Sequence, residues 1–166
     1  GNYARQTGAM IGLEIPAIKN TGTEFGNGAR YVNPKIKYIE NYTGDFDDVA
    51  TTIRRARAAG MQVLLDFHYS DDWADGDKQI VPAAWAKLAL PQQAEALYAY
   101  TREVLAQLDA QGLMPEMVQV GNETNPELMG GTKAAKLNWE RNALLLNAGI
   151  RAVRDAGKAS AISPRV

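Results

Sequence analysis

One stretch decides the fold of this chain: Met117-Val118-Gln119-Val120-Gly121-Asn122-Glu123. Its apolar residues predict a buried β-strand, and Thr124-Asn125-Pro126 predicts a loop directly behind the Asn-Glu pair. An ionisable side chain beside a dry interior is costly unless its charge is paired or its shifted pKa is used. The carboxylate of Glu123 is therefore a candidate for chemistry, because active sites of parallel-strand barrels are built where the strands end.

The sequence around this strand repeats a pattern of helices and strands. Helices are predicted from the N-cap Asp45 to Gly60, from Pro91 to Gly112, and over residues 135–156. A second apolar run, residues 61–67, predicts a strand covered on both faces. This alternation, with glycine at helix ends, is typical of parallel α/β units. Both strands then point the same way, so residues 68–73 and 122–124 are expected on one rim.

The second and third predicted helices each carry one face that is expected to be buried. In the second helix this face comprises Ala94, Leu97, Tyr98, Thr101, Leu105 and Leu108, and in the third it comprises Leu145, Ala148, Gly149 and Val153.

Residues 1–44 follow the pattern less closely. Residues 9–13 could form a strand, whereas residues 20–27 are rich in Gly, Thr and Asn and predict a loop. Asn33-Pro34 predicts a turn or an extended bend. No repeat, low-complexity tract or linker composition marks a boundary, so one domain over residues 1–166 is expected.

The composition excludes several classes of function. The 18 basic and 19 acidic residues leave a net charge of −1, which offers no strong field to nucleic acid or to an acidic membrane. With no Cys and a single His, the chain has no disulfide, no thiolate chemistry and no metal site built on several imidazoles. No apolar run approaches the roughly 20 residues of a membrane span, and no signal-like segment opens the chain. We expect a soluble protein, and a mature secreted protein would have the same composition.

Several strings of residues occur in an order and at a spacing that one enzyme family shares. They are Ala58-Ala59-Gly60-Met61, residues 63–71, Trp73-Ala74-Asp75, Pro82-Ala83-Ala84-Trp85, residues 114–125 and residues 146–154. Together, over about residues 45–155, they resemble the family 53 glycoside hydrolases, the endo-β-1,4-galactanases that cut arabinogalactan. The resemblance implies an α/β fold, the (β/α)8 TIM barrel of a retaining glycosidase clan, with about strands 1–4 in this chain. Residues 1–44 match poorly, and residues 45–156 match well.

The resemblance also implies roles for individual residues. Glu123 aligns with the general acid/base at the end of strand 4, and Asn122 aligns with the neighbour that hydrogen-bonds the sugar 2-hydroxyl. A retaining enzyme pairs such an acid with a second carboxyl, the nucleophile, about 5–5.5 Å away. The residues expected to line the substrate groove are His68, Tyr69, Asp71, Trp73 and Asn125.

Each of these residues has a purely structural alternative. Glu123 could pair with an arginine, and Asn122 could form a turn with a positive φ. His68 could bridge two loops of the rim, and Trp73 could be a buried anchor for a long loop. Asp66 could hold the interior of the barrel or orient His68.

The sequence also departs from the family. The family's nucleophile stands at the end of strand 7, which would lie beyond Val166, because eight strand-helix units need about 250 residues. Between residue 11 and Asn33-Pro34 no room is expected for a first helix and a second strand, and residues 30–34 only faintly echo the family's strand 2. The isolated chain is therefore expected to be inactive.

The leading hypothesis is a retaining endo-β-1,4-galactanase to which this chain contributes the acid/base. The alternatives are a non-catalytic half barrel that binds galactan or assembles with a missing half, and another retaining β-glycosidase of the same clan. The resemblance implies a polysaccharide substrate, an extracellular or periplasmic location and a monomer when full length. We expect no cofactor, no metal, and no nucleic-acid or membrane partner.

Overall fold

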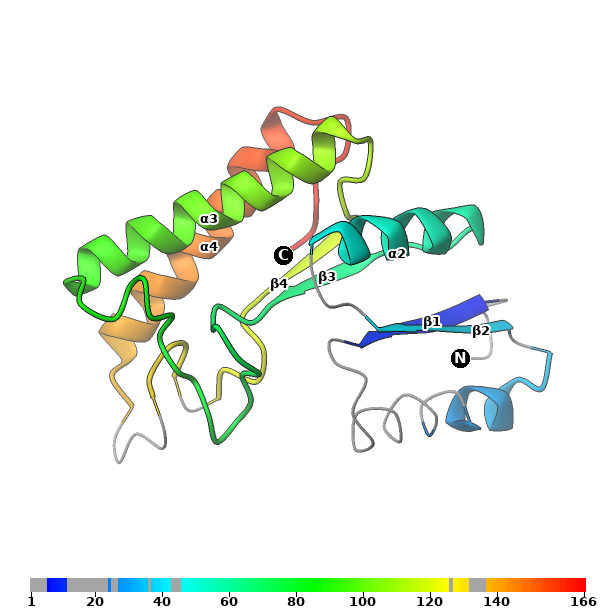
Figure 1. Cartoon of the computed structure of the whole chain (residues 1–166), viewed down its shortest axis with the longest axis horizontal. Helices are drawn as coiled ribbons and strands as arrows, with labels where there is room; N and C mark the ends of the chain where they lie inside the picture. Colours follow the sequence, from blue (N-terminus) through cyan, green and yellow to red (C-terminus); the bar gives the residue numbers. More distant parts are fainter. Residues whose placement is uncertain are drawn as a thin grey trace. The chain divides into compact units, whose positions relative to one another are not determined.

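The computed structural model describes residues 6–11, 24, 27–35, 37–42, 46–125, 127–131 and 137–166, with the backbone alone at residues 6–11, 37–42 and 46–48. The chain divides into two compact units, Gly1–Val63 and Leu64–Val166. Figure 1 shows the elements of each unit. Among the residues described, no helix is both long and apolar enough to cross a bilayer.

The first unit contains a parallel pair of strands, β1 (Gln6–Ile11) and β2 (Lys37–Tyr42). Residues 27–32 are helical, and α2 (Phe46–Ala58) follows β2 and contacts it. The helix ends where the sequence predicts, because Gly60 has a φ of +74°, a left-handed conformation that glycine adopts without a steric cost.

The structure places the second strand after residues 11–34 and not within them. Residues 27–32 are helical and β2 follows Asn33-Pro34, so the lack of room expected between residue 11 and Asn33-Pro34 does not mean that the second strand is missing. Residues 30–32 are helical and residues 34–35 form a turn, so residues 30–34 are no echo of a strand. The apolar pattern did not indicate β2 because Lys37, Glu40 and Asn41 interrupt it. The expected strand residues 12–13, most of the expected loop 20–27 and the N-cap Asp45 lie outside the described residues.

The second unit is built on a second parallel pair, β3 (Leu64–Phe67) and β4 (Met117–Val120). Leu64 lies opposite Met117, and Phe67 lies opposite Val120. The backbone of Arg165 pairs in parallel with β4 at Met117 and accepts the N–H of Val118 at 2.8 Å. Helices α3 (Leu90–Ala110) and α4 (Trp139–Lys158) lie side by side, and α4 contacts β4 (Figure 1).

The predicted faces of the two long helices form the interior of this unit. All the predicted residues are buried except Tyr98, which is half-buried and donates its hydroxyl hydrogen to Asp155 of α4 at 3.1 Å. Gly149 brings α4 close to the sheet, since a Cβ at this position would lie 2.4 Å from Cγ1 of Val120. The prediction of parallel strands that alternate with amphipathic helices is confirmed.

Strand β3 differs from its prediction in length and in covering. It begins at Leu64 rather than at residue 61. Leu65 and Phe67 are 6% and 5% exposed, whereas Leu64 is 51% exposed and Asp66 is half-buried. Within the second unit the alternation is that of a strand with one covered face.

Candidate functional site

The loops that follow β3 and β4 meet at the carboxyl ends of the two strands. They are the β3–α3 loop, residues 68–89, and the β4–α4 loop, residues 121–138, of which residues 126 and 132–136 are not described. Gly76 donates its backbone N–H to Oε2 of Glu123 at 3.0 Å, and Asn122 donates from Nδ2 to the carbonyl of Ala74 at 2.8 Å. The prediction that both strand exits lie on one rim is confirmed.

A tight turn after β4 presents Glu123. Gly121 has a φ of +84° and Glu123 a φ of +46°. A Cβ at Gly121 would lie 2.5 Å from Cγ2 of Thr124 and 2.8 Å from Cδ1 of Leu128, so only glycine fits there. The left-handed conformation costs a residue with a side chain about 1–2 kcal/mol. Strain of this kind concentrates at functional sites, and the side chain that it presents here is exposed.

Asn122 is half-buried and is held at both its side chain and its main chain. One of the two hydrogens on Nδ2 goes to Ala74, and the Asn122 carbonyl accepts a hydrogen bond from Nε2 of Gln79 at 2.8 Å. The positive φ angles fall on Gly121 and Glu123, so the alternative of Asn122 as a left-handed turn former does not apply.

His68 is held by contacts within β3 and the β3–α3 loop, and one of them determines its tautomer. Its Nδ1 accepts the backbone N–H of Ala74 at 3.2 Å, so Nδ1 carries no proton and the neutral ring carries its proton on Nε2. The Nε2 atom lies 3.6 Å from Oδ2 of Asp66, and the ring packs against Trp73 with centroids 4.7 Å apart. Burial lowers the pKa of His68, and the charge of Glu123 opposes that shift.

Asp66 points from β3 toward this imidazole. Burial raises the pKa of Asp66 to about 6, against the lowering effect of a hydrogen bond with the Gln119 side chain. Its Oδ1 atom is buried without a hydrogen-bond partner. The 3.6 Å separation from His68 is longer than a good hydrogen bond, so Asp66 does not orient the imidazole through one.

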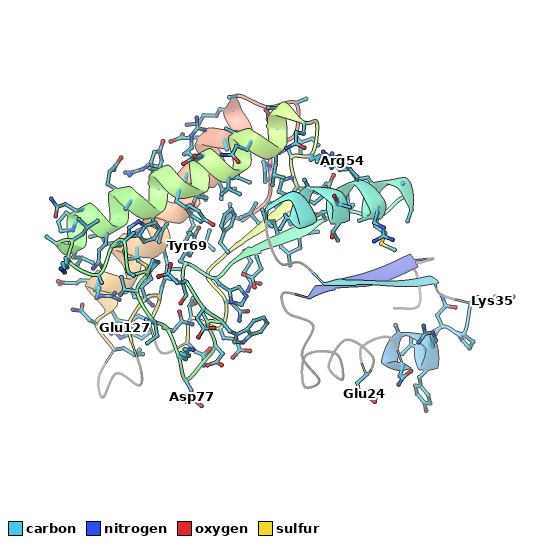
Figure 2. All side chains as sticks on the ribbon, in the orientation of Figure 1. Glu24, Lys35, Arg54, Tyr69, Asp77 and Glu127 are labelled. Carbon is cyan, nitrogen blue, oxygen red and sulfur yellow. The ribbon has the colours of Figure 1, made fainter. Side chains whose placement is uncertain are left out.

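Tyr69 belongs to the buried framework of the β3–α3 loop, whereas Asp71 is exposed and braces the same loop. Tyr69 is 4% exposed and stacks on Phe67 with ring centroids 5.4 Å apart, and Figure 2 shows it next to α3. The Oδ2 atom of Asp71 accepts the N–H of Ala83 at 2.7 Å and closes the loop on itself. Trp85 is half-buried and packs edge-on against Tyr100 of α3, as a loop anchor does.

Trp73 and Asn125 lie on the open side of the rim. Trp73 is 38% exposed, so its indole is partly available to a ligand. Asn125 is exposed, and its Nδ2 and Oε2 of Glu123 each lie 3.4 Å from the point where a Cβ at Gly76 would stand. The structure thus gathers these predicted site residues on one rim: Glu123, Asn122, His68, Trp73 and Asn125.

Sequence reasoning missed Gly76 and Gln79, which hold the turn from the β3–α3 loop. Gln79 is 1% exposed, and its Nε2 lies within hydrogen-bond distance of three carbonyls, those of Asp75, Asn122 and, more weakly at 3.4 Å, Glu123. In the sequence it is one polar residue in a polar loop, and nothing there indicates its burial. Among the described residues, no group of three or more His, Cys, Asp or Glu side chains is placed to hold a metal ion.

Comparison with known proteins identifies the family. A model of "Glycosyl hydrolase family 53" matches residues 18–164. The chain belongs to this family. It is 47% identical over 137 residues to an arabinogalactan endo-β-1,4-galactanase of Cellvibrio japonicus, covering 79% of this chain and 36% of that protein. It is 39% identical over 165 residues to an endo-β-1,4-galactanase of Bacillus subtilis, covering 85% of this chain and 37% of that protein. The chain thus spans a little over a third of these relatives.

Solved structures of this glycosyl hydrolase family give the same fold. The GH53 catalytic domain of Ignisphaera aggregans matches with a TM-score of 0.63 and 40% identity, over 71% of this chain and 32% of that domain. A fungal β-1,4-galactanase matches with a TM-score of 0.65 and 28% identity, over 99% of this chain and 40% of that structure. The described strands are part of a TIM barrel, and the expected fold class is confirmed.

Proposed function

We propose that this chain supplies the general acid/base and part of the substrate groove of a retaining endo-β-1,4-galactanase. The observation that carries the proposal is the presentation of Glu123 on a strained turn at the end of a barrel strand, with the N–H of Gly76 at 3.0 Å from its carboxylate. The names of the relatives from Cellvibrio japonicus and Bacillus subtilis support the substrate class.

In the proposed reaction Glu123 protonates the glycosidic oxygen as the bond to the leaving sugar breaks. It then takes a proton from the water that hydrolyses the glycosyl-enzyme intermediate. The hydrogen bond from Gly76 holds the carboxylate form in place between these two steps. We propose that the nucleophile, a second carboxyl about 5–5.5 Å from the first, lies on strand 7 of the barrel, as the resemblance implies.

The neighbouring side chains suit a neutral sugar. The partly exposed indole of Trp73 can stack on the apolar face of a galactose ring. The neutral tautomer of His68 offers its Nε2–H to a hydroxyl group, and the lowered pKa of His68 keeps the ring in this donor form. The hydrogen of Asn122 Nδ2 that does not go to Ala74 can bond the 2-hydroxyl, a contact that strengthens as the transition state forms.

Binding can be tested on the 166-residue chain without any catalysis. We expect β-1,4-galactotetraose to change the tryptophan fluorescence, and we expect Trp73→Ala to weaken binding by at least about tenfold, the size of a lost stacking contact. Trp139→Ala is the matched control, because Trp139 is 70% exposed at the start of α4. Equal binding by Trp73→Ala and the unmodified chain would remove Trp73 from the groove. Tighter binding of cellotetraose would favour another retaining β-glycosidase.

Hydrolysis tests the role of Glu123. Because the proposed nucleophile lies on strand 7, we expect the isolated chain to release no reducing sugar from β-1,4-galactan. Release that disappears in Glu123→Gln would support the acid/base role and place the nucleophile among these 166 residues. Release that survives Glu123→Gln would contradict the acid/base role.

Because a polysaccharide does not cross a membrane unaided, we further propose that the enzyme acts outside the cytoplasm.

A further inference from the structure

Gln79 is a buried amide in the middle of the site that the proposed chemistry does not use. It lies in the β3–α3 loop and is 1% exposed. Its Nε2 donates to the carbonyl of Asn122 at 2.8 Å and to the carbonyl of Asp75 at 2.9 Å. Each of the two amide hydrogens therefore has a strong acceptor, one on each side of the rim.

The main chain of Gln79 is also clamped. Its N–H donates to the carbonyl of Gly131 at 2.9 Å, and the N–H of Gly131 donates back at 2.7 Å. These reciprocal bonds form an antiparallel bridge between the two loops. The side chain of Gln79 thus starts from a fixed backbone, which allows its amide to hold other groups in place.

The carbonyl that Gln79 holds belongs to the peptide between Asn122 and Glu123. The φ of Glu123, +46°, is the rotation of that residue away from this peptide plane. Because the left-handed conformation is strained, the peptide would relax if no partner fixed it. A relaxed peptide would move the carboxylate of Glu123 away from the N–H of Gly76.

The two ends of the Gln79 amide differ in their hydrogen bonding. Its Oε1 atom is buried without a hydrogen-bond partner, and an unpaired buried acceptor lowers stability. A methionine has nearly the same length and volume, so it would fill the position but would leave the carbonyls of Asn122 and Asp75 without these donors. The two donors are the part of Gln79 that reaches the turn, and Oε1 is not.

We propose that Gln79 is a positioning residue for Glu123, acting through the peptide between Asn122 and Glu123. This inference rests on the proposed acid/base role of Glu123, and its geometric content can be tested without enzyme activity.

The test follows the backbone amide proton of Gly76 by NMR in the 166-residue chain as the pH is changed. The amide is expected to shift as the Glu123 carboxyl ionises, because the two are hydrogen-bonded. Glu123→Gln should remove this shift, which separates it from any effect of Asp75, Asp77 or His68 nearby. In Gln79→Met we expect the chain to stay folded and the pH-dependent shift of Gly76 to fall at least threefold. A folded Gln79→Met with the full shift would overturn the proposal.

Gln93→Met is the matched control for this substitution. The amide of Gln93 donates to the carbonyls of Trp85 and Leu88 at the end of the same loop. Gln93→Met removes side-chain hydrogen bonds to main-chain carbonyls, as Gln79→Met does, but these bonds do not reach the Glu123 turn. The pH-dependent shift of the Gly76 amide should therefore be retained in full. An equal loss of the shift in Gln93→Met would show a general loosening of the loop and would also overturn the proposal.

A measurement on the unmodified chain covers the case in which Gln79→Met does not fold. The side-chain amide protons of Gln79 should exchange slowly with water and give NOEs to the amide proton of Glu123. Rapid exchange without these NOEs would overturn the proposal. Hydrolysis that survives Glu123→Gln would instead end the proposed function and leave the NMR result intact, so the two failures are distinguishable.

Discussion

Tyr69 donates its hydroxyl hydrogen to Oγ1 of Thr101 at 2.8 Å and so ties the β3–α3 loop to the middle of α3. The direction of the bond follows from Thr101, whose own hydroxyl hydrogen goes to the carbonyl of Leu97 at 2.8 Å. Thr101 is therefore the acceptor and Tyr69 the donor. Both residues are buried, so neither can exchange this bond for one to water.

Thr101→Val should destabilise the chain by about 1–3 kcal/mol, because the Tyr69 hydroxyl would stay buried without an acceptor. Tyr69→Phe should cost about 1 kcal/mol, since Thr101 keeps its bond to Leu97. The double variant should cost less than the sum of the two, which urea denaturation can measure. Strictly additive costs would mean that the bond is not made in solution.

Gly149→Ala should lower stability by about 1–3 kcal/mol, because α4 must move away from β4 to admit the methyl group. The added Cβ would meet both methyl groups of Val120 and Cδ2 of Leu97. Gly28→Ala is the control: it lies in the helical segment 27–32, and nothing stands within 4 Å of its Cβ position. That change should be neutral or should stabilise by up to about 1 kcal/mol. Equal melting temperatures for Gly149→Ala and the unmodified chain would contradict the close packing.

Asp66→Asn should make the chain more stable at pH 7 by about 1–2 kcal/mol, allowing for the partial exposure of Asp66. The pKa of Asp66 rises from 3.8 to about 6 on folding, so the folded state binds the proton more tightly. Its contribution is therefore favourable below about pH 4 and is lost as the pH rises through about 6. The advantage of the variant should shrink toward pH 4, as denaturation at each pH would show. If the difference in stability between Asp66→Asn and the unmodified chain did not change with pH, the pKa of Asp66 would not be raised on folding.

In the Asp66→Asn variant, the pH dependence that comes from His68 can be measured by itself, and it has the opposite sign to that of Asp66. Burial lowers the pKa of His68, so its contribution to stability is complete above its ordinary pKa of 6.5 and is lost as the pH falls through the lowered value. In Asp66→Asn the stability should therefore decline on acidification below pH 6.5. Asp66→Asn combined with His68→Gln should remove this decline.

Arg141→Met should destabilise the chain by about 3–5 kcal/mol, because it leaves the buried carboxylate of Glu127 without its cation. Arg141 donates to the carbonyls of Leu128 and Met129 at 2.8 and 2.6 Å and lies 3.3 Å from Oε2 of Glu127. Arg141→Lys should recover only part of the loss, since an ammonium group cannot reproduce the planar fork. If Arg141→Lys were as stable as the unmodified chain in urea denaturation, the planar guanidinium group would not be what stabilises this region.

The sequence predicted the elements whose signals are local. The φ angles of +74° at Gly60 and +68° at Gly112 end helices where glycine was expected to end them. The meeting of His68 and Glu123 on one rim was predictable because parallel strands end on the same side. Strand β2 was missed because half its residues are polar.

The remaining misses concern side chains whose surroundings come from distant segments. Tyr69 follows a strand that the sequence placed at the site, yet its ring is buried under α3 and bonds Thr101, 32 residues away. Gln79 is 43 residues from the carbonyl it holds. No periodicity within either loop reports such a contact, because periodicity describes one element at a time.

The bonds that hold the Glu123 turn join residues 43 to 48 positions apart, so they have a consequence for the order of folding. They can form only after β3 and β4 have paired with Leu64 opposite Met117, and a slip of one residue would turn every side chain of a strand to the other face. Contacts of long sequence separation form late, because the chain loses entropy when it closes the loop between them. The rim should therefore be acquired only once β3 and β4 have paired, and its amide protons should exchange with solvent through openings that leave this strand pairing intact.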